Sequence, residues 1–596
     1  MGVVGPAAWT MARTIRTRAA TGAAGSIGDP LRIHPSRPDP QAGTPFMDVR
    51  DSITDAVRSV LADLGVDPLP TIVQLERPGN PDHGDWSTNV ALASAKAAGL
   101  NPRELGTQLA ERLLAAPPAH VVGVEVAGPG FVNFRLDDSW LHVVLADVVA
   151  AGVDGWARHD DGAGTRVIVE FVSANPTGPL HAGHGRGACY GDSVARLYDR
   201  CGYDVVREFY INDRGLQMQN FAASLAARAA GHDVPEDGYH GQYIIDWAAE
   251  MHAESGDAAD PMEWGYARAL AAHQDVLESL SIHFDSWFSE RSMIASGAID
   301  ATLSDLRAAG AVFEDGGAVW LRSTEHGDDK DRVLIKSDGE PTYLMPDVAY
   351  HRDKFGRADR LVNVFGADHH GYVARMHAAM ALLGHDPAEL EIAITQLVNL
   401  QRDGREVRLS KRTGEMVELA EVVEEVGADA ARFTYLLLSV DSSQTFDMDL
   451  VSRQVNENPV FYVQYAHARI HQIMQRATGA GIDRGSLDEA DLTLLVHPRE
   501  LEVLRSLHEL PDVVARARRE RAPHQVTTWV RDLSSSFHGF YHDCRVLGDG
   551  IDLTLTVARL WLAEGARIGL AVALDLLGVG APTEMWRDEQ RVGERV

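Results

Sequence analysis

The pattern of hydrophobic and polar positions changes along this 596-residue chain. Residues 48–136 mix helical patterns with short apolar runs, which predicts a small α+β unit. "RVIVEFV" is a nearly continuous apolar run, typical of a parallel strand buried on both faces. A helical pattern and a second strand, "YDVVREFYI", follow it and complete a β-α-β unit. Beyond residue 419 the pattern is almost wholly helical.

Two further stretches complete this pattern. Residues 215–330 are polar and rich in helical patterns, as in an insertion, and strand-like "RVLIKS", "RLVNVFGA" and "IAITQLVNL" follow. We therefore predict the α/β fold class, with a Rossmann-type parallel-sheet catalytic domain at 156–450 interrupted by an insertion at about 215–330. A small α+β N-terminal domain at 47–155 precedes it, and an all-α C-terminal domain at 451–596 follows.

The first 46 residues differ from the rest in having several arginines, few acids and many Pro, Gly and Ser residues. A targeting segment is one interpretation, but the apolar core of a secretory signal is missing. We favour a disordered tail, with the folded protein beginning at Met47.

Composition limits the cellular setting. The 3 cysteines are too few for a disulfide scaffold and too scattered for a cysteine-rich zinc site, which favours a reducing, cytoplasmic compartment. No long apolar run is free of charges, so we expect no membrane span. The formal net charge of −31 argues against non-specific coating of nucleic acid, but a local basic groove is compatible with it.

Two histidines stand at the mouth of a predicted strand-to-helix turn. Ligands of open parallel sheets bind beyond the carboxyl ends of strands, where helix N-termini offer free N–H groups. His181 and His184 can donate hydrogen bonds to phosphate oxygens, and Gly183 and Gly185 leave room for a nucleotide to approach the backbone. For an isolated pair, histidines that face water or bond carbonyls are the simpler alternative, and zinc would need three or four ligands.

A basic segment, "REVRLSKRTGEM", follows another strand pattern more than two hundred residues downstream. Its Arg408, Ser410 and Lys411 can close over a pyrophosphate leaving group. A solvated charged turn is the alternative. No P-loop motif is present in the sequence, so that route to ATP is not offered.

Two carboxylates and an aromatic ring are candidates for a substrate pocket. Glu170 lies on the strand before the histidines, and Tyr343 and Asp347 are four residues apart, on one face of a helical turn. Such a pocket suits a planar cation, because a guanidinium offers a rigid donor fork and a flat face for stacking. The alternative is that Tyr343 packs in the core and Asp347 caps a helix or pairs internally.

Several motifs, in this order, resemble those of one family. The histidine pair and the basic segment are similar to the HIGH and KMSKS elements of class I aminoacyl-tRNA synthetases. "EFVSANPTGPLHAGHGRGA", "PTYLMPDVAYH", "GADHHGYVARM" and "NPVFYVQYAHARI" resemble arginyl-tRNA synthetases of the bacterial type, as do "RPGNPDHGDWSTNVAL" and "AGPGFVNF". The resemblance covers residues 47–585.

The resemblance implies a two-step reaction. The carboxylate of L-arginine attacks the α-phosphorus of ATP, which carries Mg²⁺, to give arginyl-adenylate and diphosphate. The arginyl group then passes to the 2′-hydroxyl of the terminal adenosine of tRNA-Arg, and AMP leaves. The family needs bound tRNA for efficient activation. We expect a monomer with no protein-bound zinc and no membrane partner.

The resemblance also assigns residues to roles. The predicted catalytic residues are His181, His184 and Lys411. The predicted ATP site consists of Pro179, Gly183, His184, Gly185, Arg408, Ser410 and Lys411. The predicted arginine site consists of Glu170, Ser173, Asn175, Tyr343, Asp347 and His370.

The sequence departs from the family pattern in two places. Arg408 replaces the first lysine of KMSKS, so Lys411 is preferred as the catalytic cation. Asp368, His369 and His370 stand where some relatives use a glutamine for the α-amino or carboxylate end of the substrate. A helix cap is favoured over a metal fragment for the two histidines.

The helical C-terminal region resembles the anticodon-binding domain of this family. Tyr462, Tyr465 and Arg469 are the predicted tRNA contacts, by base stacking and phosphate binding. Core packing of the tyrosines is an open alternative. Arginines at 516–521 are a candidate phosphate patch or a solvated face.

Three other functions were weighed against this one. One is another class I synthetase, such as a glutamyl or cysteinyl type, and the set Glu170, Tyr343 and Asp347 disfavours an acidic substrate. A small nucleotidylyltransferase shares the histidine motif but leaves the flanking domains unexplained. A tRNA-binding paralogue without catalysis is disfavoured because His181, His184 and Lys411 are intact.

Overall fold

The computed structural model describes residues 48–407 and 417–585. Its first part is an α+β unit in which β3 pairs antiparallel with both β1 and β2. Ile53, Val57 and Leu61 recur at helical spacing on α1 and are fully buried. The elements are α1 (Val49–Asp63), β1 (Trp86–Thr88), α2 (Val90–Ala98), α3 (Pro102–Ala115), β2 (Val121–Ala127) and β3 (Phe131–Leu136).

A five-stranded parallel sheet follows, in the order β11-β10-β4-β5-β6. By position in the chain this is the doubly wound Rossmann order, with the reversal between β4 and β10. Val167, Ile168 and Val169 of β4 are fully buried, as the continuous apolar run predicts, and the fold class is confirmed. The elements are β4 (Arg166–Glu170), α5 (Ala182–Arg200), β5 (Asp204–Ile211), β6 (Ser286–Ser289), α11 (Leu344–Arg357), β10 (Arg360–Gly366), α12 (Val373–Leu382) and β11 (Leu390–Thr395).

A row of polar residues crosses this apolar sheet. Glu208 on β5, Glu170 on β4 and Asn363 on β10 are direct neighbours in the strand register, and all three are buried. Register neighbours on parallel strands project from the same face of the sheet. The helix that covers this face must therefore provide hydrogen-bond partners along this row. Helix α11 supplies them, as described below.

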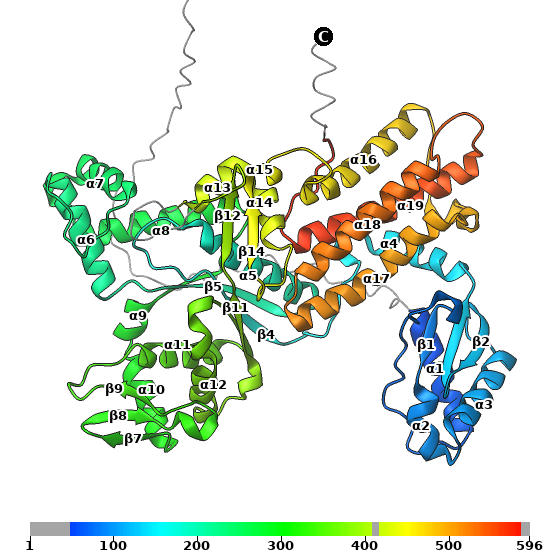
Figure 1. Cartoon of the computed structure of the whole chain (residues 1–596), viewed down its shortest axis with the longest axis horizontal. Coiled ribbons are helices and arrows are strands. Elements are labelled where there is room, and N and C mark those ends of the chain that lie inside the picture. The colour runs from blue at the N-terminus through cyan, green and yellow to red at the C-terminus, as the bar shows by residue number, and fades with distance from the viewer. Residues whose placement is uncertain (1–47, 408–416, 586–596) are drawn as a thin grey trace, which may run out of the picture. The chain divides into compact units, whose positions relative to one another are not determined.

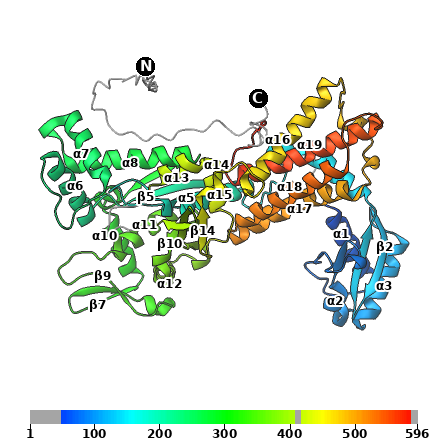
Figure 2. The same ribbon diagram turned by 45° about the horizontal axis from the view of Figure 1, so that its top comes forward.

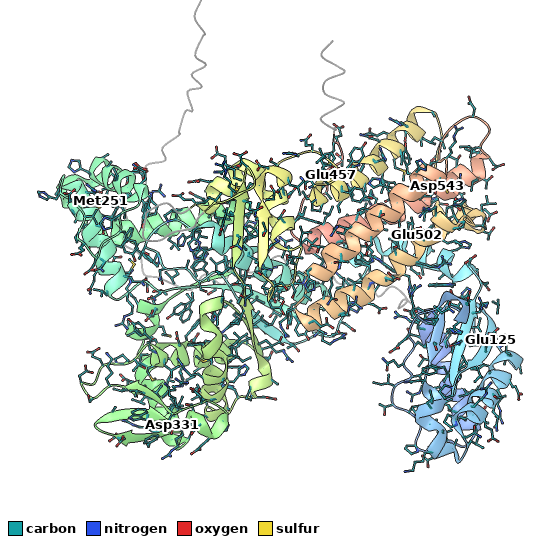
Figure 3. All side chains as sticks on the ribbon, viewed as in Figure 1. Glu125, Met251, Asp331, Glu457, Glu502 and Asp543 are labelled. Carbon is teal, nitrogen blue, oxygen red and sulfur yellow. The ribbon has the colours of Figure 1, made fainter. Side chains whose placement is uncertain are left out.

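The segment predicted as an insertion contains part of the main sheet. Helices α6 to α8 pack around Phe221, Trp247 and Met251, and Figure 3 labels Met251 among these helices. Strand β6 lies inside the predicted range but joins the main sheet beside β5. The strand-like run "RVLIKS" does not join the main sheet: its first four residues form β9 of a separate antiparallel sheet, β7-β8-β9, beside α11 (Figure 1). A short apolar run does not specify which sheet it joins. The elements are α6 (Leu216–Ala229), α7 (Gln242–Ser255), α8 (Pro261–Ser279), α9 (Glu290–Ala295), α10 (Ala298–Ala308), β7 (Val312–Asp315), β8 (Ala318–Leu321) and β9 (Arg332–Ile335).

A small sheet, β13-β12-β14, precedes the basic segment with β12 and β13 and is completed by β14, which comes later in the chain. The run "IAITQLVNL" therefore holds two strands, β11 of the main sheet and β12 of this one. The elements are β12 (Val398–Arg402), β13 (Arg405–Val407), α13 (Leu419–Val426), α14 (Ala428–Tyr435), β14 (Gln444–Asp447) and α15 (Met448–Val451).

The C-terminal region is helical, as predicted. Helices α17, α18 and α19 run side by side (Figures 1 and 2). Helix α4 (Ser139–Gly155), at the end of the segment predicted as the N-terminal domain, packs against α17 and α19. The domain boundaries stay predictions. The remaining helices are α16 (Pro459–Gly479), α17 (Pro498–Glu520), α18 (His524–Asp543) and α19 (Leu553–Leu576).

One buried guanidinium joins three segments that are distant in the chain. Arg432 of α14 donates to the Asp192 carboxylate on α5 (2.5 Å), the Leu280 carbonyl (2.6 Å) and the Leu577 carbonyl after α19 (3.0 Å). Gly578 lies against it with φ +65°, and a Cβ there would lie 2.0 Å from the guanidinium. The catalytic and helical parts thus share a core contact.

The described helices include none that is both long and apolar enough to cross a membrane. The three cysteines are free and buried.

Candidate active site

The candidate site lies where the strand order of the main sheet reverses. Strand β4 ends at Glu170, and the chain turns before α5 begins at Ala182. Val172 and Ser173 in this turn have φ values of +68° and +43°, in the left-handed region that is costly for a β-branched residue. Such strain concentrates at ligand-binding turns, and the reversal point is where doubly wound sheets bind ligands.

His181 and His184 cap the start of α5 reciprocally. The backbone N–H of Gly183 donates to His181 Nδ1 (3.1 Å), and that of His181 donates to His184 Nδ1 (3.1 Å). A nitrogen that accepts a hydrogen bond carries no proton, so both rings are neutral with the proton on Nε2. The ring centroids lie 3.7 Å apart, so two Nε2–H donors lie close together. In the described residues no cluster of His, Cys, Asp or Glu could hold a metal ion.

The two glycines of the motif leave room for neighbouring side chains. A Cβ at Gly185 would lie 2.6 Å from the ring of Tyr435, whose hydroxyl donates to the Ala182 carbonyl (3.0 Å). A Cβ at Gly183 would lie 2.9 Å from the His181 ring. Both glycines therefore have a packing role, and their place beside a bound nucleotide stays a prediction. Pro179 is half-buried just before the cap.

Three predicted residues of the basic segment lie outside the described residues: Arg408, Ser410 and Lys411. The segment's C-terminal flank is described. The N–H of Ala182 donates to the Val417 carbonyl (2.9 Å), and the N–H of Leu419 donates to the Leu180 carbonyl (2.8 Å). The chain that follows the basic segment is therefore paired directly with the histidine motif.

Arg186 ties α5 to the small sheet that precedes the basic segment. Its buried guanidinium donates to the carbonyls of Ser442 (2.6 Å), Ser439 (2.7 Å) and Gln396 (3.3 Å). Gln396 lies before β12 and Ser442 before β14. One side chain thus fixes the helix that carries the histidines against the small sheet whose strand β13 ends at residue 407.

Glu170 is buried and hydrogen-bonded on both oxygens. Its Oε1 accepts from the Ser173 hydroxyl (3.0 Å), which also accepts from the N–H of Tyr210 (3.2 Å). Its Oε2 accepts from Nζ of Lys354 (2.7 Å), a fully buried lysine on α11. Lys354 was not predicted from the sequence, although its helical spacing from Asp347 puts both residues on one stripe of α11.

Asp347 and Tyr343 differ in exposure. Asp347, in the first turn of α11, is half-buried and accepts a hydrogen bond from the hydroxyl of Tyr372. Tyr343, which precedes α11, is 94% exposed, so the alternative that it packs in the core is wrong. The bond from Tyr372, another residue that the sequence analysis missed, is an internal partner for Asp347.

Two other predicted arginine-site residues, Asn175 and His370, lie on separate segments of the chain. The Asn175 side-chain amide donates to Oε1 of Gln217 at the start of α6 (2.5 Å). His370 belongs to the 3₁₀ turn Ala367–Tyr372, but its side chain lies outside the described part of the structure.

Three carboxylates set the charge of the site. Burial raises the pKa of Asp347 to about 7; the Tyr372 hydrogen bond opposes this rise, and nearby Glu170 and Glu290 add to it. Burial also raises the pKa of Glu290, on α9. Burial disfavours the ionised form of these carboxylates, so a cation that binds beside them stabilises the site.

The predicted tRNA contacts on α16 face α18. Tyr462 is half-buried with its ring 4.7 Å from that of His538, whereas Tyr465 is 6% exposed. Arg469 donates to the Tyr465 hydroxyl (2.9 Å) and lies over the rings of Tyr465 and Tyr541. Burial of Tyr465 favours the packing alternative for that residue.

The arginines at 516–521 are mostly engaged in polar contacts. Arg518 pairs with Asp161 (2.8 Å), and Arg521 pairs with Glu391 of the main sheet. Arg516 donates to Gln525 (2.7 Å). These contacts favour neither a free phosphate patch nor a purely solvated face.

A doubly wound sheet with paired imidazoles at its first helix, and with a basic segment joined to them, defines a class I aminoacyl-tRNA synthetase. Three family models match the chain. "Arginyl tRNA synthetase N terminal domain" matches residues 49–136, and "tRNA synthetases class I (R), catalytic domain" matches 150–237 and 269–472. "DALR anticodon binding domain" matches 463–585.

Curated relatives agree. The chain is 45% identical over 552 residues to an arginine–tRNA ligase of Frankia alni, covering 90% of this chain and 99% of that protein. It is 45% identical to that of Moorella thermoacetica, covering 90% and 98%. The arginyl-tRNA synthetase structure from Thermus thermophilus shares the fold with a TM-score of 0.70 at 23% identity, over 90% of this chain and all of that one.

The chain belongs to the arginyl-tRNA synthetase family. Its activity is that of an arginine–tRNA ligase, which charges tRNA with arginine through an adenylate. The predicted function is confirmed, and the rival synthetases and the nucleotidylyltransferase are set aside.

Proposed function

We propose that the guanidinium group of arginine binds between Asp347 and Glu170. The observation that carries this proposal is a half-buried carboxylate whose pKa is raised to about 7, next to a second carboxylate at the sheet reversal. A planar donor fork that binds there offsets the cost of burying these charges. Ser173 positions Glu170, and the exposed ring of Tyr343 covers the guanidinium plane. Asn175 and His370 are assigned to the α-amino and carboxylate end.

We propose that His181 and His184 donate from Nε2 to the phosphate oxygens of ATP. As an oxygen of the arginine carboxylate bonds to the α-phosphorus, the bond to the bridging oxygen of the β-phosphate breaks and diphosphate leaves. Lys411, with Arg408 and Ser410, stabilises the charge that develops on this leaving group. Mg²⁺ enters with ATP. No covalent enzyme intermediate is needed.

We propose that the second substrate is tRNA-Arg, contacted by Tyr462 and Arg469 on α16. Tyr465 supports Arg469 through its hydroxyl and ring. We also propose that the enzyme acts as a monomer in the cytoplasm, where buried free thiols persist.

Pyrophosphate exchange with each of the twenty amino acids, with and without total tRNA, tests the substrate proposals. Exchange should depend on arginine and rise when tRNA is present. Equal exchange with lysine would contradict the guanidinium site. A rate of pyrophosphate exchange that is the same with and without tRNA would contradict the expected coupling to the second substrate.

A further inference from the structure

The carboxylates proposed to bind arginine are joined by a chain of buried polar side chains. Nζ of Lys354 donates to Glu170 Oε2 (2.7 Å) and to Asn363 Oδ1 (2.8 Å). The Asn363 amide faces Nε2 of His351 (2.6 Å), and Nδ1 of His351 faces the backbone carbonyl of Asp347 (2.8 Å). Lys354, Asn363 and His351 are each at most 2% exposed, and none of them had a predicted role.

The direction of every hydrogen bond in this series of side chains follows from the donor at its start, Lys354. An ammonium group only donates, so the Asn363 oxygen accepts and its NH₂ group must donate to His351 Nε2. Nε2 therefore carries no proton, and Nδ1–H donates to the Asp347 carbonyl. The neutral ring is consistent with burial and with Lys354, which hold the pKa of His351 well below its ordinary value.

The fold explains why these residues meet. Asn363 is the register partner of Glu170 on the neighbouring strand, so both project from one face of the sheet. Asp347, His351 and Lys354 recur at helical spacing on α11, which covers that face. A fully buried lysine is rare unless it is paired, and here its position and charge are matched to Glu170.

We propose that Lys354 is a positioning and specificity residue for arginine, which acts through Glu170 and, by way of Asn363 and His351, on the backbone of Asp347. Its charge balances Glu170, so of the two carboxylates proposed to bind arginine only Asp347 lacks a resident cation, and a single guanidinium supplies that charge. This inference rests on the proposed arginine site.

The ionisable groups around the two carboxylates come from four elements. They are Tyr210 and Glu208 on β5, Glu290 on α9, Tyr350, His351 and Lys354 on α11, and Tyr372 on the 3₁₀ turn. Without Lys354, Glu170 and Asp347 become two neighbouring acids with no resident cation, and one of them holds a proton to higher pH.

The test compares Lys354→Met with the double variant Glu170→Gln/Lys354→Met, by arginine-dependent pyrophosphate exchange in the presence of tRNA. We expect Lys354→Met to raise the KM for arginine about 30-fold or more while sparing the KM for ATP. The acid limb of kcat/KM for arginine should move up by about one pH unit. In the Glu170→Gln background the further effect of Lys354→Met should shrink, because Lys354 acts through Glu170.

Two more variants keep the result interpretable if Lys354→Met folds poorly. The double variant removes both members of a buried ion pair, which is far less harmful than removing one. Asn363→Leu keeps the ion pair but breaks the path to His351, so the KM for arginine should rise about tenfold with no shift of the acid limb.

Arg357→Met is the matched control. Arg357 is on the same helix and pairs with buried Glu208 (2.7 Å), a residue that is not proposed to bind arginine. It should lower stability and leave the acid limb unmoved. Wild-type arginine kinetics in Lys354→Met, or losses that add fully to those of Glu170→Gln, would overturn the inference. If Glu170→Gln and Asp347→Asn alone leave the KM for arginine unchanged, the proposed site itself fails.

Discussion

Asp347→Asn should weaken arginine use and, at the same time, stabilise the protein in a pH-dependent way. The variant keeps an oxygen that can accept from Tyr372 but removes a charge that is half-buried. The two effects have the same origin, because the cost of burying the carboxylate is offset only when the cation binds.

The size of the stability effect follows from the pKa of Asp347, which is about 7 in the folded chain against an ordinary value of 3.8. The native state binds more protons than the unfolded state between about pH 4 and pH 7, so the wild-type free energy of unfolding falls as pH rises through this window. Each tenfold change in an acid constant is about 1.4 kcal/mol, so the variant gains up to about 4 kcal/mol at pH 8 and about 2 kcal/mol at pH 5. These are upper limits, because part of the side chain meets solvent.

Apparent Tm measured by calorimetry at pH 5 and pH 8 tests this reasoning. The advantage of the variant should grow with pH, at roughly 2 °C per kcal/mol for a domain of this size. The same preparation should show kcat/KM for arginine reduced about 30-fold or more, with the KM for ATP little changed. A Tm difference of equal size at both pH values would refute the buried-charge argument. Equal damage to both KM values would remove Asp347 from the arginine site.

Three further predictions concern the rest of the site. Lys411→Ala should lower kcat roughly 10²–10³-fold in pyrophosphate exchange, and a variant near wild type would remove Lys411 from the chemistry. Gly185→Ala should lower the apparent Tm and kcat, because the added Cβ would lie 2.6 Å from the Tyr435 ring. Gly187→Ala on the same helix is the control and should behave as wild type, because the nearest atom to its Cβ is 4.0 Å away. Arg432→Met should cost about 3–5 kcal/mol by leaving Asp192 buried without its cation, and an unchanged Tm would show that Arg196 and Arg207 suffice.

The parts of the site that were predictable from the sequence are those encoded locally. The strand before His181, the helix after it and the turn between them lie within one short segment whose apolar run and turn residues specify β4 and α5. The parts that were missed depend on strand order. Nothing near Lys354 in the sequence indicates that β10 will lie beside β4 and bring Asn363 next to Glu170.

Short strands were the second feature of the fold that could not be predicted from the sequence. Strand β6 has four residues, "SWFS", whose pattern cannot be distinguished from a loop, so its place in the main sheet was hidden inside a helix-rich stretch. The residue that follows it, Glu290, is one of the site's acids. The glycine at 185 was identified as special, but its reason, the ring of Tyr435, comes from a helix about two hundred and fifty residues away.

The shared contact at Arg432 bears on how this enzyme can be divided. Its hydrogen bond to the Leu577 carbonyl and its contact with Gly578 mean that the residues directly after α19 complete the interior of the sheet-bearing part. A fragment cut before α16 would retain every residue proposed to touch ATP or arginine, yet it would carry an interior guanidinium stripped of one acceptor. Anticodon-side truncations should therefore be judged first by whether the remainder folds, and loss of aminoacylation in such fragments does not by itself demonstrate a role in reading tRNA.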